Sequence, residues 1–119
     1  MASILTKAEV RDLEKQYIAR LNVPDADAYT VRSARRSARV RAKLDCHLNV
    51  PYGDSPGQML DVFPALKSGA PVHIFIHGGY WRNPDLTKDT YSHMAAPMVA
   101  AGAAVVLPDY DLCPAVSIT

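Results

Sequence analysis

Two almost continuous apolar runs, residues 72–76 and 103–107, do most to limit how this chain can fold. Short apolar runs without polar alternation are typical of strands that are covered on both faces in a parallel sheet. Residues 87–101 between them have a helical pattern, with Asp89 suited to the first turn of a helix and Gly102 suited to end it. A strand, a helix and a strand in this order predict a crossover between parallel strands and an α/β fold.

Pro97 lies inside this predicted helix. A proline there either kinks the helix or occupies the first turn of a shorter second helix. The sequence leaves both alternatives open. We therefore expect a helical connection here, without predicting whether it is one continuous helix or two shorter ones.

The residues ahead of the crossover have the pattern of a β-hairpin. Residues 59–63 read as a strand after a turn at residues 51–57. The preceding strand is marked by apolar residues that alternate with polar ones, namely Leu44, Cys46, Leu48 and Val50. An antiparallel pair beside a parallel crossover makes the expected sheet mixed.

Two helices are expected before the hairpin. Thr6 and Glu9 have the spacing of a capping box, which predicts a helix start, and an apolar face follows at Val10, Leu13, Tyr17 and Leu21. Pro24 interrupts this pattern, and a second helix is expected over residues 29–44. We therefore divide the chain into a helical segment, residues 1–43, and a sheet-containing core, residues 44–119.

The second helix is expected to be amphipathic. Its predicted apolar stripe consists of Val31, Ala34, Ala38 and Ala42. Its basic side consists of Arg32, Arg35, Arg36, Arg39 and Lys43. A solvated helix face is favoured over a nucleic-acid or acidic-substrate surface, because no aromatic residues interleave with the basic ones.

Composition excludes several other classes of protein. About half of the residues are apolar and the formal net charge is +1, as in an ordinary globular domain without the basic excess that binds nucleic acid or a membrane surface. The first ten residues include Lys7 and Glu9 and lack the apolar run of a signal peptide, so a cytoplasmic location is expected. Cys46 and Cys113 have neither metal-site nor disulfide-framework spacing, so no zinc site and no disulfide are expected.

The segment with most chemical information is His77-Gly78-Gly79-Tyr80-Trp81, which directly follows the apolar run 72–76. Two glycines after a strand allow the backbone to turn sharply and to point successive N–H groups into one small space. Converging N–H donors can stabilise the oxyanion that forms during acyl transfer. The simpler alternative is a tight turn that merely needs glycine, but the preceding strand and the aromatic pair favour an oxyanion loop.

His77-Gly78-Gly79-Tyr80-Trp81 resembles the HGG-type loop of the lipase and esterase branch of α/β hydrolases, in the form typical of kynurenine formamidases. The segment from Pro108 to Pro114, PDYDLCP, is similar to a second formamidase motif. The resemblance extends from about Tyr29 to the end of the chain, including VPYG at residues 50–53 and LDVF at residues 60–63. It implies that residues 44–119 form the first half of an α/β-hydrolase core that is incomplete at its C-terminus.

The resemblance also implies an activity and a set of roles. The activity is the hydrolysis of an N-formyl amide, N-formylkynurenine, to kynurenine and formate by a Ser-His-Asp triad without a cofactor. The backbone N–H groups of Gly79 and Tyr80 would form part of the oxyanion hole, and Tyr80 and Trp81 would contact the substrate. His77 and Gly78 would be structural, and replacement of Gly79 by alanine is expected to lower turnover far more than stability.

The nucleophile and the base of the triad are not assignable in this chain. A hydrolase of this fold needs a serine in a G-x-S-x-G turn, and none of Ser3, Ser33, Ser37, Ser55, Ser68, Ser92 and Ser117 has flanking glycines. Asp109 and Asp111 are interpreted as carboxylates that orient a loop. His47, His73 and His93 have no triad partner at a useful spacing, and His73 is interpreted as a core histidine.

Three functions remain open. The first is a formamidase, the second is a carboxylesterase or thioesterase of the same superfamily, and the third is a noncatalytic fragment. If the protein is a hydrolase, we expect the open edge of the strand at residues 72–76 to pair with the remaining C-terminal part of the hydrolase or with a symmetry-related copy. No nucleic-acid or membrane partner is expected.

Overall fold

The computed structural model describes residues 5–118, so Ser3 and Thr119 lie outside the described residues. Two compact units divide the chain into Met1–Val31 and Arg32–Thr119. This boundary falls inside a long helix, α2 (Ala26–Lys43), whose residues contribute to both units. The division at residues 43 and 44 remains a prediction about how the complete protein is organised.

The first unit begins with helix α1 (Lys7–Tyr17), and its start is the predicted capping box. The Glu9 N–H donates to Thr6 Oγ1 at 3.3 Å, and the Thr6 N–H donates to Glu9 Oε2 at 2.7 Å, so two otherwise unpaired donors are satisfied. A 3₁₀ turn (Ala19–Asn22) follows before α2 begins. No residue of α1 is buried within the described structure.

The α2 residues of the second unit pack through a different face from the predicted one. The predicted apolar stripe, Val31, Ala34, Ala38 and Ala42, is exposed. The buried residue is Ser37, whose hydroxyl donates to the Thr90 carbonyl at 2.8 Å. Arg41 donates to the Asp89 carbonyl at 2.6 Å, and Val40 lies against the apolar core. Polar side chains on this face bond to backbone carbonyls of the next helical segment, which a search for apolar periodicity cannot detect.

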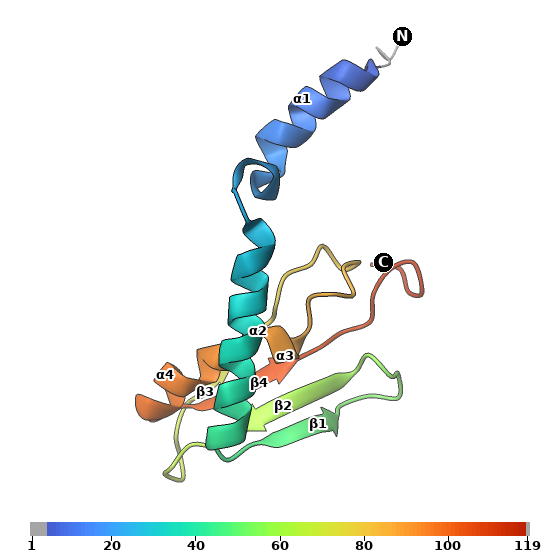
Figure 1. Ribbon diagram of the computed structural model, residues 1–119. Helices are drawn as coiled ribbons and strands as arrows, with labels where there is room; N and C mark the ends of the chain where they lie inside the picture. The colour runs from blue at the N-terminus through green and yellow to red at the C-terminus, as the bar shows by residue number, and fades with distance from the viewer. Residues whose placement is uncertain (1–4, 119) are drawn as a thin grey trace. The chain divides into compact units, whose positions relative to one another are not determined.

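The second unit contains a mixed four-stranded sheet in the order β1-β2-β4-β3 (Figure 1). Its strands are β1 (His47–Pro51), β2 (Met59–Phe63), β3 (Val72–Ile74) and β4 (Ala104–Pro108). The β1–β2 pair is antiparallel, as predicted, and so is the β2–β4 pair. The β3–β4 pair is parallel, with Ile74 opposite Val106, which confirms the predicted crossover.

The connection between β3 and β4 is helical but broken. It consists of α3 (Lys88–Tyr91), a 3₁₀ turn (Ser92–Met94) and α4 (Ala95–Ala100). Pro97 lies in the first turn of α4, where its missing N–H costs no helical hydrogen bond, so the second of the two alternatives is correct. Gly102 follows the helix with a φ of +96°, as expected for a residue that ends a helix.

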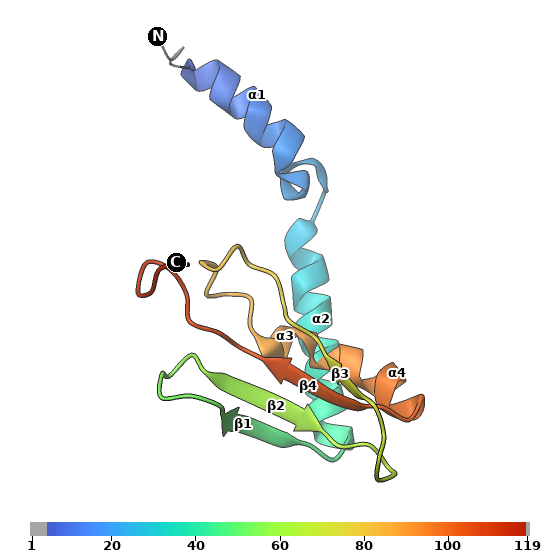
Figure 2. The same ribbon diagram turned by 180° about the vertical axis from the view of Figure 1, so that it is seen from behind.

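The two faces of the sheet differ in their covering. One face carries the buried core of Phe63, Val105 and Leu107, against which Ala95 and Val99 of α4 pack. Figure 2 shows the opposite face, over which no described helix lies. On that face Val72, Ile74 and Ile76 are each more than 60% exposed, so the prediction that both faces of this strand are covered is wrong for the described residues. No helix in residues 5–118 has both the length and the apolar content needed to cross a membrane.

Candidate active site

The two sequence motifs meet at one edge of the sheet. The β3 and β4 strands are parallel, so the loops that follow their carboxyl ends begin side by side. We define the 77–88 loop as the segment after β3 that starts at His77 and ends at Lys88, the first residue of α3, and the loop after β4 starts at Asp109. We call Gly78–Trp81 the tip of the first loop, and His77, Lys88 and Asp109 its base.

His77 is held at the base by contacts on every side. It is 6% exposed, and its Nε2 lies 2.9 Å from Asp109 Oδ1. Its Nδ1 lies 2.8 Å from the Gly78 carbonyl oxygen. Both ring nitrogens therefore lie within hydrogen-bond distance of oxygen atoms. These contacts support a structural role for His77 in holding the loop.

The aromatic ring of Tyr110 extends this arrangement into the second motif. It stacks on the His77 ring at a centroid distance of 4.7 Å, and its hydroxyl donates to the His77 carbonyl at 2.7 Å. Burial, followed by the charge of Asp109, raises the pKa of Tyr110, so its phenol stays protonated and remains a donor. The Cys113 N–H also donates to the Trp81 carbonyl at 2.7 Å. The two motifs are thus bonded to each other.

The tip of the loop has a strained backbone. Tyr80 and Trp81 have φ values of +55° and +53°, and the Gly79 carbonyl accepts from the Arg82 N–H at 3.1 Å. These are the φ values of a type I′ turn, which normally has glycine or asparagine at its two central positions. Two consecutive aromatic residues in the left-handed region are costly and mark a site where function is to be sought. The Gly78-Gly79 motif in the sequence did not reveal that the strained φ angles fall on Tyr80 and Trp81.

The two proposed donors are free within the described part of the chain. The backbone N–H groups of Gly79 and Tyr80 make no hydrogen bond with any atom of residues 5–118. The side chains beside them are open to solvent, with Tyr80 85% and Trp81 53% exposed. Their roles as oxyanion donors and substrate contacts remain predictions.

Gly78 and Gly79 differ in why they are glycine. Gly79 has a φ of +136°, which L side chains rarely adopt. Gly78 does not have a positive φ, and a Cβ atom built on it would meet nothing within 4 Å. No described contact therefore requires glycine at position 78.

A cavity of about 320 Å³ lies beside the base of the loop. Its lining includes His77, Leu86, Asp109 and Tyr110, which come from both loops. Gly79 and Tyr80 do not line it, so the expectation that their N–H groups face a cavity stays a prediction.

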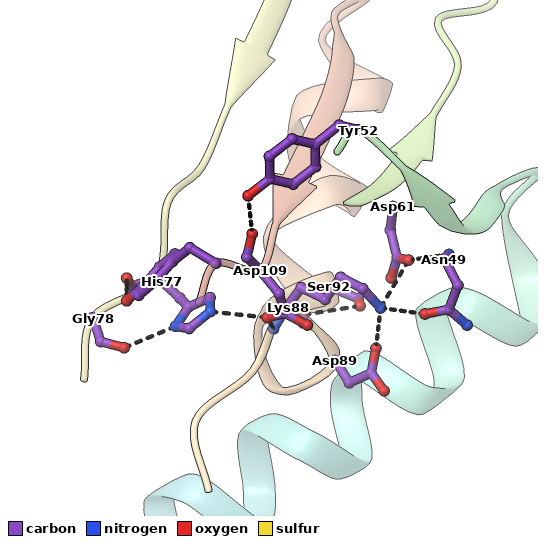
Figure 3. A network of polar contacts seen from close by, with 10 residues as sticks. Asn49, Tyr52, Asp61, His77, Gly78, Lys88, Asp89, Ser92 and Asp109 are labelled. Atoms are coloured by element: carbon purple, nitrogen blue, oxygen red, sulfur yellow. Dashed lines mark hydrogen bonds and ion pairs between the residues drawn. The ribbon is translucent and has the colours of Figure 1, made fainter. Parts of the chain in front are cut away.

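Sequence reasoning missed a buried polar cluster around Lys88, which Figure 3 shows from close by. The Lys88 Nζ atom lies 3.0 Å from Asp61 Oδ1 and 2.8 Å from Asn49 Oδ1. Lys88 is 3% exposed and Asp61 is fully buried. Asp61 follows the period-2 alternation of β2 onto the same face as the core residue Phe63, and a carboxylate on a core face needs a cationic partner. That alternation was the signal available in the sequence.

Electrostatics keep this lysine charged. Burial alone would lower the pKa of Lys88, but hydrogen bonds to Asp61 and Asp89 and the charges of both carboxylates outweigh it and raise the pKa overall. Asn49 reaches the cluster from a β-bulge in β1, where its φ is +55°, and its N–H donates to Asp61 Oδ1 at 2.9 Å. Bulges commonly re-aim a side chain in this way.

His93 has a serine neighbour that the sequence did not indicate. Its Nδ1 lies 3.0 Å from Ser37 Oγ, because the packing of α2 brings together residues that are distant in sequence. The same hydroxyl donates to Thr90 O and accepts the His93 N–H at 2.9 Å, and Ser37 is fully buried. A nucleophile must be accessible to its substrate, so this pair holds helices together and performs no acyl transfer.

The other candidate residues lie apart from this chemistry. His47 is exposed and His73 is half-buried, and neither ring makes a hydrogen bond within residues 5–118. Asp111 accepts a hydrogen bond from Ser55 and so orients its loop, as expected. Within the described residues no group of three or more His, Cys, Asp or Glu side chains could hold a metal ion.

Comparison with known proteins identifies relatives of this chain. No family model matches the chain. It is 42% identical over 78 residues to a kynurenine formamidase of Salmo salar, a match that covers 64% of this chain and 26% of that protein. It is 36% identical over 111 residues to a kynurenine formamidase of Danio rerio, covering 87% of this chain and 37% of that protein.

The chain is a homologue of the kynurenine formamidases. A third kynurenine formamidase, from Drosophila melanogaster, is 38% identical over 69 residues, which are 56% of this chain and 22% of that protein. These matches therefore span 22% to 37% of the length of the curated kynurenine formamidases.

Solved structures agree on the fold. A protein from Silicibacter sp. tm1040, provisionally assigned as a thioesterase, superposes with a TM-score of 0.78 at 33% identity, covering 89% of this chain and 40% of that one. Esterase B from Lactobacillus rhamnosis superposes with a TM-score of 0.54 at 23% identity, covering 77% of this chain and 32% of that one. The predicted α/β-hydrolase fold is confirmed.

Proposed function

We propose that this chain supplies the oxyanion-hole loop of a hydrolase that acts by serine-type acyl transfer on an N-formyl amide, with N-formylkynurenine as the substrate. The observation that carries the proposal is the pair of unbonded N–H groups of Gly79 and Tyr80, on a loop fixed at the carboxyl edge of a parallel strand pair. Homology to kynurenine formamidases supports the choice of substrate class.

The chemistry follows from what such donors do. A serine oxygen attacks the formyl carbon, and the carbonyl oxygen becomes an oxyanion that the two N–H groups stabilise in the tetrahedral intermediate. Collapse of the intermediate releases the aryl amine, and water then releases formate from the acyl-enzyme. Removing one such donor costs about a hundredfold to a thousandfold in turnover in a known hydrolase.

The nucleophile, the carboxylate and the base of the triad come from a further segment of the hydrolase in this proposal. That segment would pair with the open edge of β3 and cover the exposed face that carries Val72, Ile74 and Ile76. Expression of residues 1–119 alone tests this part. A soluble monomer with a cooperative unfolding transition and no partner, by size-exclusion chromatography and thermal unfolding, would count against it.

A second candidate function is a carboxylesterase or thioesterase. The observation in its favour is the likeness to the Silicibacter protein, which is structurally close over 89% of this chain. The deciding experiment assays the complete polypeptide on N-formylkynurenine, on a short p-nitrophenyl ester and on an acyl thioester. Negligible formamidase turnover with rapid ester or thioester cleavage would replace the first function by the second.

A further inference from the structure

We propose that Asp109 and Lys88 are positioning residues that clasp the base of the 77–88 loop and thereby fix the oxyanion donors at its tip. The expected effect on catalysis rests on the proposed function, whereas the clasp itself rests on the distances between His77, Lys88 and Asp109. An oxyanion hole works only when its donors are fixed before the charge develops.

The first part of the clasp is a single carboxylate oxygen. Asp109 Oδ1 lies 2.9 Å from His77 Nε2 and accepts the Lys88 backbone N–H at 2.7 Å (Figure 3). His77 and Lys88 are the first and last residues of the loop. Since one atom binds both, the two ends of the loop are held together at its base.

The second part is the side chain of Lys88. Its ammonium donates to Asp61 of β2 and Asn49 of β1, and also lies 3.0 Å from Asp89 Oδ1. The end of the loop is thereby anchored to the antiparallel half of the sheet. Asp109, which directly follows β4, holds the start of the loop beside the end of that strand.

The buried charges are better explained by positioning than by stability. An apolar pair of similar volume often stabilises a fold as well as a buried ion pair, because burial removes water from both charges. Asp61 Oδ2 is buried without a hydrogen-bond partner in the described structure, which is a further cost. We therefore expect such a cluster where the fixed position of the residues matters more than the stability of the fold.

The tip itself has few ties to the rest of the chain. The Gly79 carbonyl accepts from Arg82 and Asn83, which belong to the same loop. The bond from Cys113 to Trp81 is its backbone tie to the neighbouring loop. The place of the Gly79 and Tyr80 donors therefore depends on the base.

The test uses the complete polypeptide and a matched set of variants. Asp109→Asn keeps an oxygen that accepts both hydrogen bonds, Asp109→Ala removes it, and Asp54→Ala removes an exposed carboxylate elsewhere. We expect Asp109→Ala to lower kcat about a hundredfold, as for a misplacement of about 1 Å, with KM changed less than about threefold. Asp109→Asn should stay within about fivefold of the parent, and Asp54→Ala should match it. A parent-like kcat for Asp109→Ala, or equal losses in both Asp109 variants, would overturn the clasp.

A second readout is independent of activity. Amide hydrogen exchange of Arg82, Asn83 and Lys88 should become at least about tenfold faster in Asp109→Ala and stay near the parent rate in Asp109→Asn. If the parent hydrolyses none of the substrates but exchange follows this pattern, the proposed function fails and the clasp stands. If the parent is active and exchange is unchanged in Asp109→Ala, the clasp fails alone.

A further variant covers the case in which Asp109→Ala does not fold. Asp61→Asn removes the charge that holds the Lys88 ammonium but keeps an acceptor, and charge-assisted hydrogen bonds are about twice as strong as neutral ones. We expect about fivefold lower kcat and faster exchange of the Lys88 amide. Parent values for both quantities would overturn the role of Lys88.

Discussion

At the base of the 77–88 loop, His77 and Lys88 are 6% and 3% exposed and their polar atoms bond to Asp109, Asp61 and Asn49. At the tip, Tyr80 is 85% exposed, has a left-handed backbone and leaves its N–H without a partner in the described chain. The base resembles a structural core built from polar groups. The tip has the properties of a site whose partner is a substrate, so substitutions in the two regions should have different consequences.

The largest effect is expected at the base, from Lys88→Met. This change leaves the carboxylate of Asp61 buried without its cation, and breaking a buried pair in this way costs about 3–5 kcal/mol. The free energy of unfolding in denaturant measures it. The double variant Lys88→Met/Asp61→Asn removes both charges and should recover much of the loss.

Lys67→Met is the matched control, because Lys67 is exposed. It should change stability by less than about 0.5 kcal/mol. A Lys88→Met variant as stable as this control would show that the base is not organised by the buried pair, and the contrast with the tip would lose its physical basis.

The next effect is expected at the tip, from Gly78→Ala. A Cβ atom there meets nothing within 4 Å, so the melting temperature should not change. If the open space beside Gly78 is where the oxyanion forms next to the Gly79 donor, the methyl group would crowd it, and turnover should fall about a hundredfold, or about 2.7 kcal/mol. Parallel measurements of kcat and melting temperature test this, and unchanged kcat would leave Gly78 with the structural role that the resemblance implies.

Gly79→Ala should behave differently from its neighbour. The φ of +136° is strained for any L side chain, so alanine is expected to cost about 1–3 kcal/mol of stability. This expected loss of stability comes from the positive φ of Gly79, which the sequence-based expectation for this substitution did not include. Thermal unfolding of the two alanine variants side by side gives the comparison, and equal melting temperatures would contradict the backbone described for the tip.

A smaller effect of opposite sign is expected from Tyr80→Asn. Asparagine tolerates a left-handed backbone better than tyrosine, and the exposed Tyr80 side chain contributes little burial, so stability should rise by about 1 kcal/mol. If Tyr80 contacts the substrate, KM should rise at the same time. A loss of stability would show that the Tyr80 ring packs against part of the protein.

The smallest effect concerns alkaline pH. The pKa of Lys88 is raised above its ordinary value of 10.5 in the folded state, so its contribution to stability is complete below that value and is lost as the pH rises through the folded pKa. As the pH rises above 10.5, the parent should therefore lose more stability than Lys88→Met/Asp61→Asn. The raised pKa values of Tyr52 and Tyr110 act in the same window in both proteins and cancel in the comparison.

Local chemistry made much of the fold predictable. The bounds of β2, the Thr6–Glu9 capping box and the helix start near Pro97 follow from short-range rules on alternation, capping and proline geometry. The meeting of the two motifs was predictable because parallel strands bring their carboxyl ends to one edge. Each of these depends on neighbours in sequence or on topology.

What could not be predicted depends on long-range polar contacts. Lys88 in the series Thr87-Lys88-Asp89 looks like an ordinary charged residue at a helix start, and only the inward position of Asp61 shows that it must be buried. The buried face of α2 was misassigned because Ser37 packs through hydrogen bonds. In both cases one polar residue decides the packing, and its partner is far away in sequence.

The bond between His77 and Asp109 has a consequence for how the sheet is assembled. Ile74 lies opposite Val106 in the parallel pair, and His77 and Asp109 lie equally far beyond these two residues. The bond therefore joins positions that would face each other if the ladder simply continued. A slip of β3 along β4 by one residue would reverse the direction of every side chain of β3 and separate the His77 imidazole from the Asp109 carboxylate. The His77–Asp109 pair that holds the loop thus also stabilises one register of β3 and β4 relative to the shifted registers.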